Sequence, residues 1–207
     1  MKWLDRLEEI FITFLIGAAT TIIFVAVVHR YLSGLPLGSF QDALLKLNFG
    51  WAQELCIILF VWMAKFGAAY GVRQGIHVGV DVLVNKLSPQ NRRIMTIVAL
   101  SAGILFTGIV AALGASMVWE NGMAYALLHS LGMDVGEHFE GPTTPDLEWP
   151  TWIVYLAVPL GSSLMCFRFI QVLVHYIRTG DLPHHDHGHV DGLEDAAEHL
   201  PVVEHKP

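Results

Sequence analysis

Long runs of apolar residues alternate with shorter polar segments along this chain. A helix rises about 1.5 Å per residue, so roughly 20 apolar residues cross a hydrocarbon core about 30 Å thick. Four runs have the length that crossing requires, at residues 10–28, 55–72, 94–118 and 152–174. The first run is followed by "HRY" rather than by a small-residue cleavage site, which favours an anchor over a cleaved signal peptide. The pattern therefore predicts an all-α integral membrane protein with four transmembrane helices.

Two connecting segments also carry helical signals. In "SFQDALLKLNFGW", residues 39–51, apolar positions recur at helical spacing, with Ser39 as the expected N-cap and Asp42 three residues later. We predict a short helix lying flat in the outer interface, with an ordinary connector as the alternative. After the third span, "MAYALLHSLG" either extends that helix or forms a second interfacial segment. Pro150 suits a first helical turn, and Pro159 favours a kink or a close neighbouring helix.

The two ends of the chain differ from its apolar middle. Residues 1–9 are expected to form a short cytoplasmic interfacial lead-in, and residues 10–178 the four-helix membrane domain. From 179 to 207 the chain is polar, acidic and rich in histidine, which is typical of a disordered tail. Such histidine tracts bind metal ions loosely and without a fixed geometry, so we predict no metal site there.

The basic residues that flank the spans indicate the orientation. Short cytoplasmic segments carry more lysine and arginine than external ones. With the amino terminus inside, the outer side holds only Arg30 and Lys46, whereas the inner side holds Lys2, Arg6, Arg73, Lys86, Arg92, Arg93, Arg178 and Lys206. We therefore expect both termini in the cytoplasm.

Composition narrows the class of protein and of partner. Apolar residues make up 54% of the chain and charged residues 15%, which excludes an ordinary soluble domain. The formal net charge is −7, partly because residues 119–151, here called the acidic loop, contain six acidic residues and no lysine or arginine. We therefore do not expect nucleic acid as a partner.

The two cysteines, Cys56 and Cys166, are not expected to form a disulfide. In the predicted layout they differ in depth by roughly 20 Å, whereas the Cα atoms of a disulfide lie within about 7 Å of each other. We expect two free thiols that pack among apolar side chains.

The second span leads into "GVRQGIHVGVD", residues 71–81. If its helix continues to residue 81, two sets of residues line opposite faces: the glycine stripe (Gly67, Gly71, Gly75 and Gly79) and the polar row (Arg73, His77 and Asp81). A glycine stripe lets a neighbouring helix approach closely. The polar row offers too few ligands for a metal ion, and a proton relay would need ionisable groups across the bilayer. Two interpretations remain: a face exposed to the cytoplasm, or a polar contact with another helix or subunit.

Lys65 lies within the second span, roughly 12 Å from Arg73 along a helix. A lysine side chain reaches only part of that distance, so its ammonium group either extends into a water-filled crevice or meets an acidic partner. The predicted spans supply no carboxylate at that depth. An acidic partner would therefore come from another polypeptide or from a lipid.

Five segments carry a resemblance to a known family: "DRLEE", "FVAVVHRY", "WAQELCIILFVWMAKFGAAYGVRQGIHVGVD", "LSPQNRR" and "PTWIVYLAVPLGSSLMCFRFIQ". Through them the chain resembles the DctQ-type small membrane subunits of TRAP transporters, the tripartite ATP-independent periplasmic carriers. The resemblance covers about residues 3 to 178 and is weakest in the acidic loop, which is longer than usual for the family.

The resemblance implies a small scaffold subunit of a secondary transporter in a bacterial inner membrane. Its partners would be a large multi-span carrier subunit, which holds the substrate and sodium sites, a periplasmic substrate-binding protein, and membrane lipid. The sequence of the second span is most similar to the C4-dicarboxylate branch.

The positions that match the family signature are Trp51, Glu54, Arg73, His77, Asp81, Pro159, Gly161 and Arg168. With this resemblance, we interpret the glycine stripe and the polar row as subunit-docking positions. Glu137, Glu140, Asp146 and Glu148 become candidate contacts for the binding protein.

Two other functions remain as alternatives. A self-sufficient carrier or channel usually shows repeated halves around a midplane site, and four spans with one isolated lysine supply neither. A four-helix anchor or cytochrome-type redox subunit would need histidines within the spans on facing helices, but His29 and His77 lie at or beyond the ends of their spans, on opposite sides of the membrane. We therefore expect neither enzymatic activity nor a cofactor.

Overall fold

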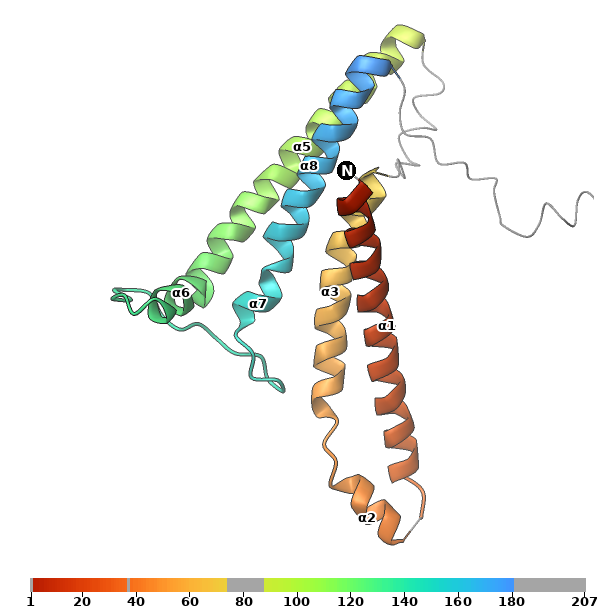
Figure 1. Cartoon of the computed structure of the whole chain (residues 1–207), viewed down its shortest axis with the longest axis vertical. Helices are drawn as coiled ribbons and strands as arrows, with labels where there is room; N and C mark the ends of the chain where they lie inside the picture. Colours follow the sequence, from red (N-terminus) through yellow and green to blue (C-terminus); the bar gives the residue numbers. More distant parts are fainter. Residues whose placement is uncertain (1, 37, 74–87, 181–207) are drawn as a thin grey trace, which may run out of the picture.

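The computed structural model describes residues 2–36, 38–73 and 88–180, and Figure 1 shows helices joined by short connections and by one longer loop between α6 and α7. The helices are α1 (Lys2–Ser33), α2 (Ser39–Leu45), α3 (Gly50–Arg73), α5 (Pro89–Val118), α6 (Ala124–Ser130), α7 (Thr151–Tyr155) and α8 (Ala157–Thr179). Four stretches are long and apolar enough to cross a membrane: Arg6–Ser33, Gly50–Arg73, Gln90–Ser130 and Thr151–Thr179. The predicted fold class, an all-α protein with four membrane-spanning helices, is confirmed.

The long helices form a single row rather than a closed bundle. α1 packs on α3, α3 on α8, and α8 on α5, whereas no Cα atom of α1 lies within 8 Å of a Cα atom of α8 or α5 in the described residues. Figure 1 shows the result as two helix pairs, α1 with α3 and α5 with α8. A row one helix thick leaves both broad faces exposed to lipid or to other subunits.

The tightest apolar packing lies where α3, α5 and α8 meet. Val72, Leu100, Phe169, Val172 and Tyr176 form one buried cluster. Elsewhere large apolar side chains are exposed, among them Phe24 on α1 and Phe106 on α5, at 66% and 68%. Such exposure is unfavourable in water and is expected of surfaces that face hydrocarbon or a partner helix.

The first connecting segment forms the predicted short helix, α2. The expected N-cap was wrong by one position: Gly38 is the N-cap, no side chain caps the helix, and Ser39 is its first residue. The carbonyl oxygen of Gly38 accepts the first backbone hydrogen bond, from the amide of Asp42 at 3.3 Å, so the chain enters the helix without a serine cap.

The segment after α5 turns away instead of extending that helix. The chain leaves helical geometry at Asn121 and at Gly122, where φ is +110°, within the kinked segment η1 (Trp119–Met123). α6 then begins at Ala124 as a separate element. Of the two alternatives for "MAYALLHSLG", the structure therefore has the separate segment.

The fourth span is interrupted near its start. Pro150 is the N-cap of α7 rather than part of its first turn. α7 ends at Tyr155 and α8 begins at Ala157, because Pro159 has no N–H to donate to the carbonyl of Tyr155. The predicted kink at Pro159 thus takes the form of a break between two helices, after which α8 continues to Thr179.

Both cysteines are free, as predicted. The thiol of Cys56 donates to the carbonyl oxygen of Ala19 at 3.3 Å, and that of Cys166 to the carbonyl oxygen of Ile104 at 3.6 Å. Each thiol therefore links neighbouring helices, α3 to α1 and α8 to α5 respectively.

The structure bears on the prediction for the lead-in but not on the prediction for the tail. Residues 2–9 are helical and continuous with the first span, so they are not a separate element; their placement at the cytoplasmic interface stays a prediction. The tail from residue 181 onward lies outside the described residues.

Candidate functional site

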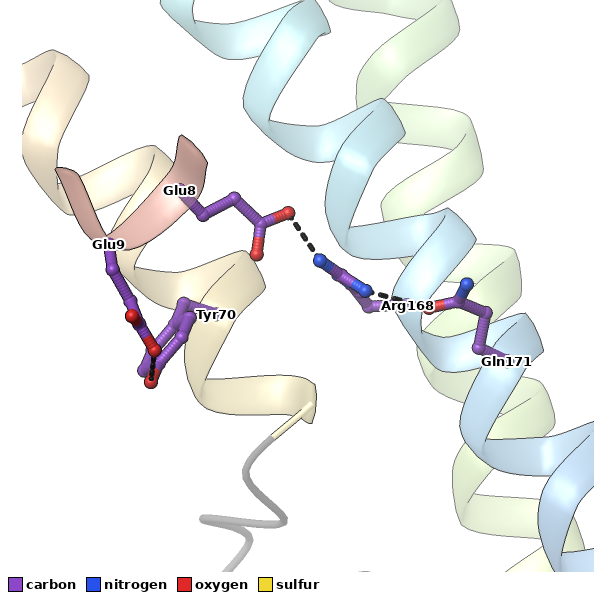
Figure 2. Close-up of polar contacts among 5 residues, drawn as sticks. All are labelled: Glu8, Glu9, Tyr70, Arg168 and Gln171. Atoms are coloured by element: carbon purple, nitrogen blue, oxygen red, sulfur yellow. Dashed lines mark hydrogen bonds and ion pairs between the residues drawn. The ribbon is translucent and has the colours of Figure 1, made fainter. Parts of the chain in front are cut away.

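A buried ion pair joins α1 and α8, the first and the last long helix along the chain. The Arg168 Nη2 donates to Glu8 Oε1 at 2.7 Å, and the two side chains are only 1% and 4% exposed (Figure 2). Arg168 Nη1 also donates to Gln171 Oε1, one turn further along α8, at 2.9 Å. Because the backbones of α1 and α8 are not neighbours, this contact is made by the long side chains alone.

The local sequence explains why both charges are buried. Glu8 shares one face of α1 with Leu15 and Ala19, at spacings of seven and four residues, and that face is buried. Arg168 lies next to buried Phe169 and one turn before buried Val172 on α8. Two charges removed from water in this way are stable only while each has an opposite charge or hydrogen-bonding partners. The pair therefore makes the packing of α1 depend on α8.

A second polar contact lies beside the first. Tyr70 of α3 donates its hydroxyl to Glu9 Oε1 at 2.7 Å, and Figure 2 shows this bond next to the Glu8–Arg168 pair. The consecutive acids of α1 thus bind different helices, Glu8 reaching α8 and Glu9 reaching α3. Sequence reasoning missed both roles because it assigned residues 1–9 to a separate lead-in.

Gly161 is where α3 and α8 approach most closely. A Cβ atom added to Gly161 would lie 2.6 Å from the Cβ of Lys65 and 3.2 Å from its backbone carbonyl carbon. Contacts this short do not occur, so the helices would have to separate. Gly161, which we predicted to be a signature position, therefore permits the close contact between α3 and α8.

We expect Gly161→Ala to weaken the contact between the helix pairs, with a net loss of about 1–2 kcal/mol after the better helix propensity of alanine is included. Gly108→Ala is the matched control, because a Cβ there would meet only Cys166 Sγ at 3.8 Å, an ordinary contact distance. Thermal unfolding of the purified chain in detergent measures both. Equal melting temperatures for the two variants would contradict the close contact.

Glu54 connects the start of α3 with the acidic loop. Its Oε2 accepts hydrogen bonds from the backbone amides of Asp146 and Leu147, at 2.6 and 3.3 Å. These amides lie at the tip of a turn in which the Thr144 amide donates to the Trp149 carbonyl at 2.7 Å. Glu54, which we predicted to be a signature residue, therefore holds a turn of the loop against the helix row, at the opposite end of α3 from Tyr70.

A backbone contact closes the acidic loop on its other side. Gly122 and Gly141 have φ values of +110° and +82°, and their backbones pack directly on one another. A Cβ on Gly122 would overlap the carbonyl oxygen of Glu140, and one on Gly141 the carbonyl oxygen of Asn121. Together with Glu54, this contact gives the loop a defined shape. No sequence signal pointed to it.

The four candidate acids of the loop, Glu137, Glu140, Asp146 and Glu148, are all exposed. Large apolar side chains are exposed among them, including Phe139 at 60% and Trp149 at 41%. The folded loop therefore presents carboxylates and aromatic rings together on an accessible surface.

No described residue lies close to the described half of the glycine stripe. Nothing lies within 4 Å of a Cβ added at Gly67 or Gly71. α3 is described as far as Arg73; Gly75, His77, Gly79 and Asp81, and hence most of the polar row, lie outside the described residues. Gly67 and Gly71 thus leave space beside α3 that no described helix of this chain fills.

Two further candidates, Trp51 and Lys65, lie on α3. Trp51 stacks on Phe49 and donates its indole N–H to the Asn48 carbonyl at 3.1 Å, which fixes the turn that precedes α3. Lys65 is half-buried, and its ammonium group has no hydrogen bond or ion pair with a described residue. Both alternatives for Lys65, a water-filled crevice and an acidic partner from outside the chain, therefore stay predictions.

Comparison with known proteins agrees with these features. Residues 19–179 match the family model described as tripartite ATP-independent periplasmic transporters, DctQ component. A C4-dicarboxylate TRAP transporter small permease protein DctQ from Rhodobacter capsulatus is 51% identical, over 94% of this chain and 86% of the relative. A protein of the same description from Vibrio cholerae serotype O1 is 31% identical, over 91% of this chain and 78% of the relative. An isethionate TRAP transporter permease protein DctMQ from Oleidesulfovibrio alaskensis is 24% identical, over 86% of this chain but 25% of the relative.

Proposed function

Since the chain belongs to the DctQ component family of TRAP transporters, a family of transport proteins and not of enzymes, we propose that it is the scaffold subunit of a C4-dicarboxylate importer. In this proposal a large multi-span carrier subunit holds the substrate and sodium sites, and a periplasmic binding protein delivers the substrate. The 51% identity to a relative named for C4-dicarboxylates supports the substrate class.

The single-row arrangement of α1, α3, α8 and α5 is the observation that carries the scaffold role. A transport pathway within one chain needs helices that surround a central site, usually at the interface of repeated halves. A row one helix thick encloses no such site and offers two broad faces for contact. It therefore suits a protein that supports a carrier rather than one that conducts solute itself.

The relative from Oleidesulfovibrio alaskensis supports a direct contact with a larger permease. There, a stretch similar to this chain makes up 25% of a longer polypeptide named as a permease. Segments joined in one chain in one organism commonly bind one another as separate chains elsewhere. We propose that the face of α3 carrying Gly67 and Gly71 is part of that contact, because no described helix of this chain covers it.

Uptake by reconstituted vesicles tests the proposed function. Vesicles containing this chain alone should not accumulate labelled succinate in a sodium gradient, whereas vesicles that also contain the carrier should do so once the binding protein is added. Removing the gradient should abolish uptake. Accumulation by the chain alone would overturn the scaffold proposal, and uptake that is independent of sodium would overturn the coupling.

We expect Gly67→Leu and Gly71→Leu to reduce recovery of the carrier subunit with this chain by at least about tenfold, because a leucine side chain would occupy the space proposed for the partner helix. The melting temperature of the chain itself should not fall, since neither position contacts a described helix. Ala68→Leu is the control, an exposed small residue about 100° from Gly67 and about 60° from Gly71 around α3. Full recovery of the carrier with both glycine variants would refute docking at this face.

The acidic loop is the proposed surface for the binding protein. Complementary charges mainly raise the rate of association, so replacing Glu137, Glu140, Asp146 and Glu148 by the corresponding amides should slow it several-fold. The effect should shrink as the ionic strength rises. Stopped-flow measurement of binding to the membrane complex detects it. An unchanged association rate at low salt would dispose of this surface.

The proposed orientation has both termini in the cytoplasm and the acidic loop outside, in the bacterial inner membrane. The excess of lysine and arginine beyond the other ends of the helices supports this choice. Single cysteines introduced at Ser130 and at Thr179, in a variant with Cys56 and Cys166 replaced by serine, should react with an impermeant maleimide only at position 130 in intact cells.

A further inference from the structure

A cleft of about 440 Å³ lies where α1, α2 and α3 meet. One wall is apolar and comes from α1, with Ile23, Ala26 and Val27. The rim is polar, with Arg30, Ser33 and Gln53, and none of the described residues that line the cleft is acidic. Its volume falls within the range of small-molecule sites.

The walls of this cleft are held in place by contacts of their own. His29 Nε2 is 2.9 Å from the carbonyl oxygen of Leu44, and the His29 ring packs on Phe49 with centroids 4.6 Å apart. Gln41 of α2 donates to the carbonyl oxygen of Ser33 at 3.1 Å. The cleft is therefore a built feature of the fold, because α2 is attached at both of its sides to α1.

The unengaged polar groups at the rim indicate what the cleft binds. Neither the guanidinium of Arg30 nor the side-chain amide of Gln53 has a hydrogen bond or ion pair with a described residue, and both residues are exposed. Lys46, directly after α2, is also exposed and adds a second positive charge at this end of the helices. A guanidinium binds phosphate through two parallel hydrogen bonds. Because none of the described residues that line the cleft carries a negative charge, the cleft favours a ligand with net negative charge.

The place of the cleft along the helices identifies the source of that phosphate. Figure 1 shows α2 beyond the ends of α1 and α3, which is the level of lipid headgroups when these helices cross a bilayer. A free anion would use only the rim, whereas a phospholipid would also cover the apolar wall formed by α1. We propose that the cleft binds an anionic glycerophospholipid, with its phosphate at Arg30 and Gln53 and the first carbons of an acyl chain along Ile23 and Val27.

The test uses the full chain in mild detergent, with dioleoyl phosphatidylglycerol or dioleoyl phosphatidylcholine added, and counts retained lipid by native mass spectrometry. Wild type should retain several-fold more phosphatidylglycerol than phosphatidylcholine. Arg30→Gln should weaken phosphatidylglycerol binding about tenfold, the effect expected from losing charge-assisted hydrogen bonds. Ala26→Phe, which fills the apolar wall, should also weaken it.

Arg6→Gln is the matched control, because it removes the same charge from an exposed site of the same helix about 36 Å away. Circular dichroism confirms that each variant is folded. Equal retention by Arg30→Gln and Arg6→Gln, or no preference between the two lipids, would overturn the site. Displacement of the lipid by millimolar inorganic phosphate would overturn the lipid assignment in favour of a free anion. The assay needs no other subunit, so its outcome is separate from that of the proposed function.

Discussion

Replacing Arg168 with methionine should lower the free energy of unfolding of the chain by about 3–5 kcal/mol, because it leaves the carboxylate of Glu8 buried without its cation. Glu8 is 4% exposed, and its Oε2 already lacks a hydrogen-bond partner among the described residues. Glu8→Gln leaves the Arg168 guanidinium buried without a counter-charge, but it should cost less, since the amide oxygen can still accept from Arg168 and Arg168 keeps its bond to Gln171. Denaturant or thermal unfolding in detergent measures both changes.

The double variant Glu8→Gln with Arg168→Met separates a specific pair from general damage. It should be more stable than Arg168→Met alone, because the buried charge has been removed together with its partner. Glu9→Gln is the control on the neighbouring residue: Glu9 is exposed, and an amide oxygen can still accept from Tyr70, so the change should be within about 1 kcal/mol. Additive losses in the double variant would contradict the pairing.

Substitution of Gly122 by alanine should unfold the acidic loop locally, at a cost of about 3 kcal/mol or more. Part of the cost arises because φ of +110° is strained for any residue with a Cβ, and part because that Cβ overlaps the carbonyl oxygen of Glu140. A backbone atom cannot rotate away as a side chain can. The loop would have to leave its contact with the end of α5.

Gly132→Ala isolates the first of these causes, the conformational cost. Gly132 lies in the same loop with φ of +68°, but nothing lies within 4 Å of an added Cβ, so only the conformational cost of about 1–2 kcal/mol applies. Hydrogen exchange of the amides at 143–150 should rise strongly in Gly122→Ala and little in Gly132→Ala. Similar exchange in the two variants would show that the contact with Glu140 does not hold the loop.

The four spanning helices were predictable because the length of an apolar run is a strong signal in a membrane protein. The same criterion hid the role of Glu8. The acidic residues of "DRLEE" precede the apolar run and so were left out of the span, although the helix begins before them, at Lys2. Extending the helical period backwards from Leu15 and Ala19 places Glu8 on their face, and that signal was present in the sequence. Reading Arg168 as a buried charge that requires a carboxylate would then have indicated the pair.

The order of the helices could not be predicted in the same way. α3 is apolar on nearly all sides, so its sequence does not indicate which face meets α1, which meets α8, and which stays open at Gly67 and Gly71. The contact between Gly122 and Gly141 joins positions in a segment without periodic pattern, where no local rule relates them. The family resemblance identified Gly161 and Pro159 as signature positions, but nothing in the sequence indicates that Gly161 contacts Lys65.

The single row of helices has a consequence for biosynthesis. Each outer helix packs on a helix from its own half of the chain, α1 on α3 and α5 on α8, so the first pair can assemble in the bilayer before the second has left the ribosome. Glu8 is synthesised 160 residues ahead of Arg168, so the ion pair cannot form until α8 has been made. The arrival of that guanidinium is then the event that completes the subunit, and quality-control proteases acting on membrane proteins would meet an unneutralised carboxylate in every chain that stops short of it.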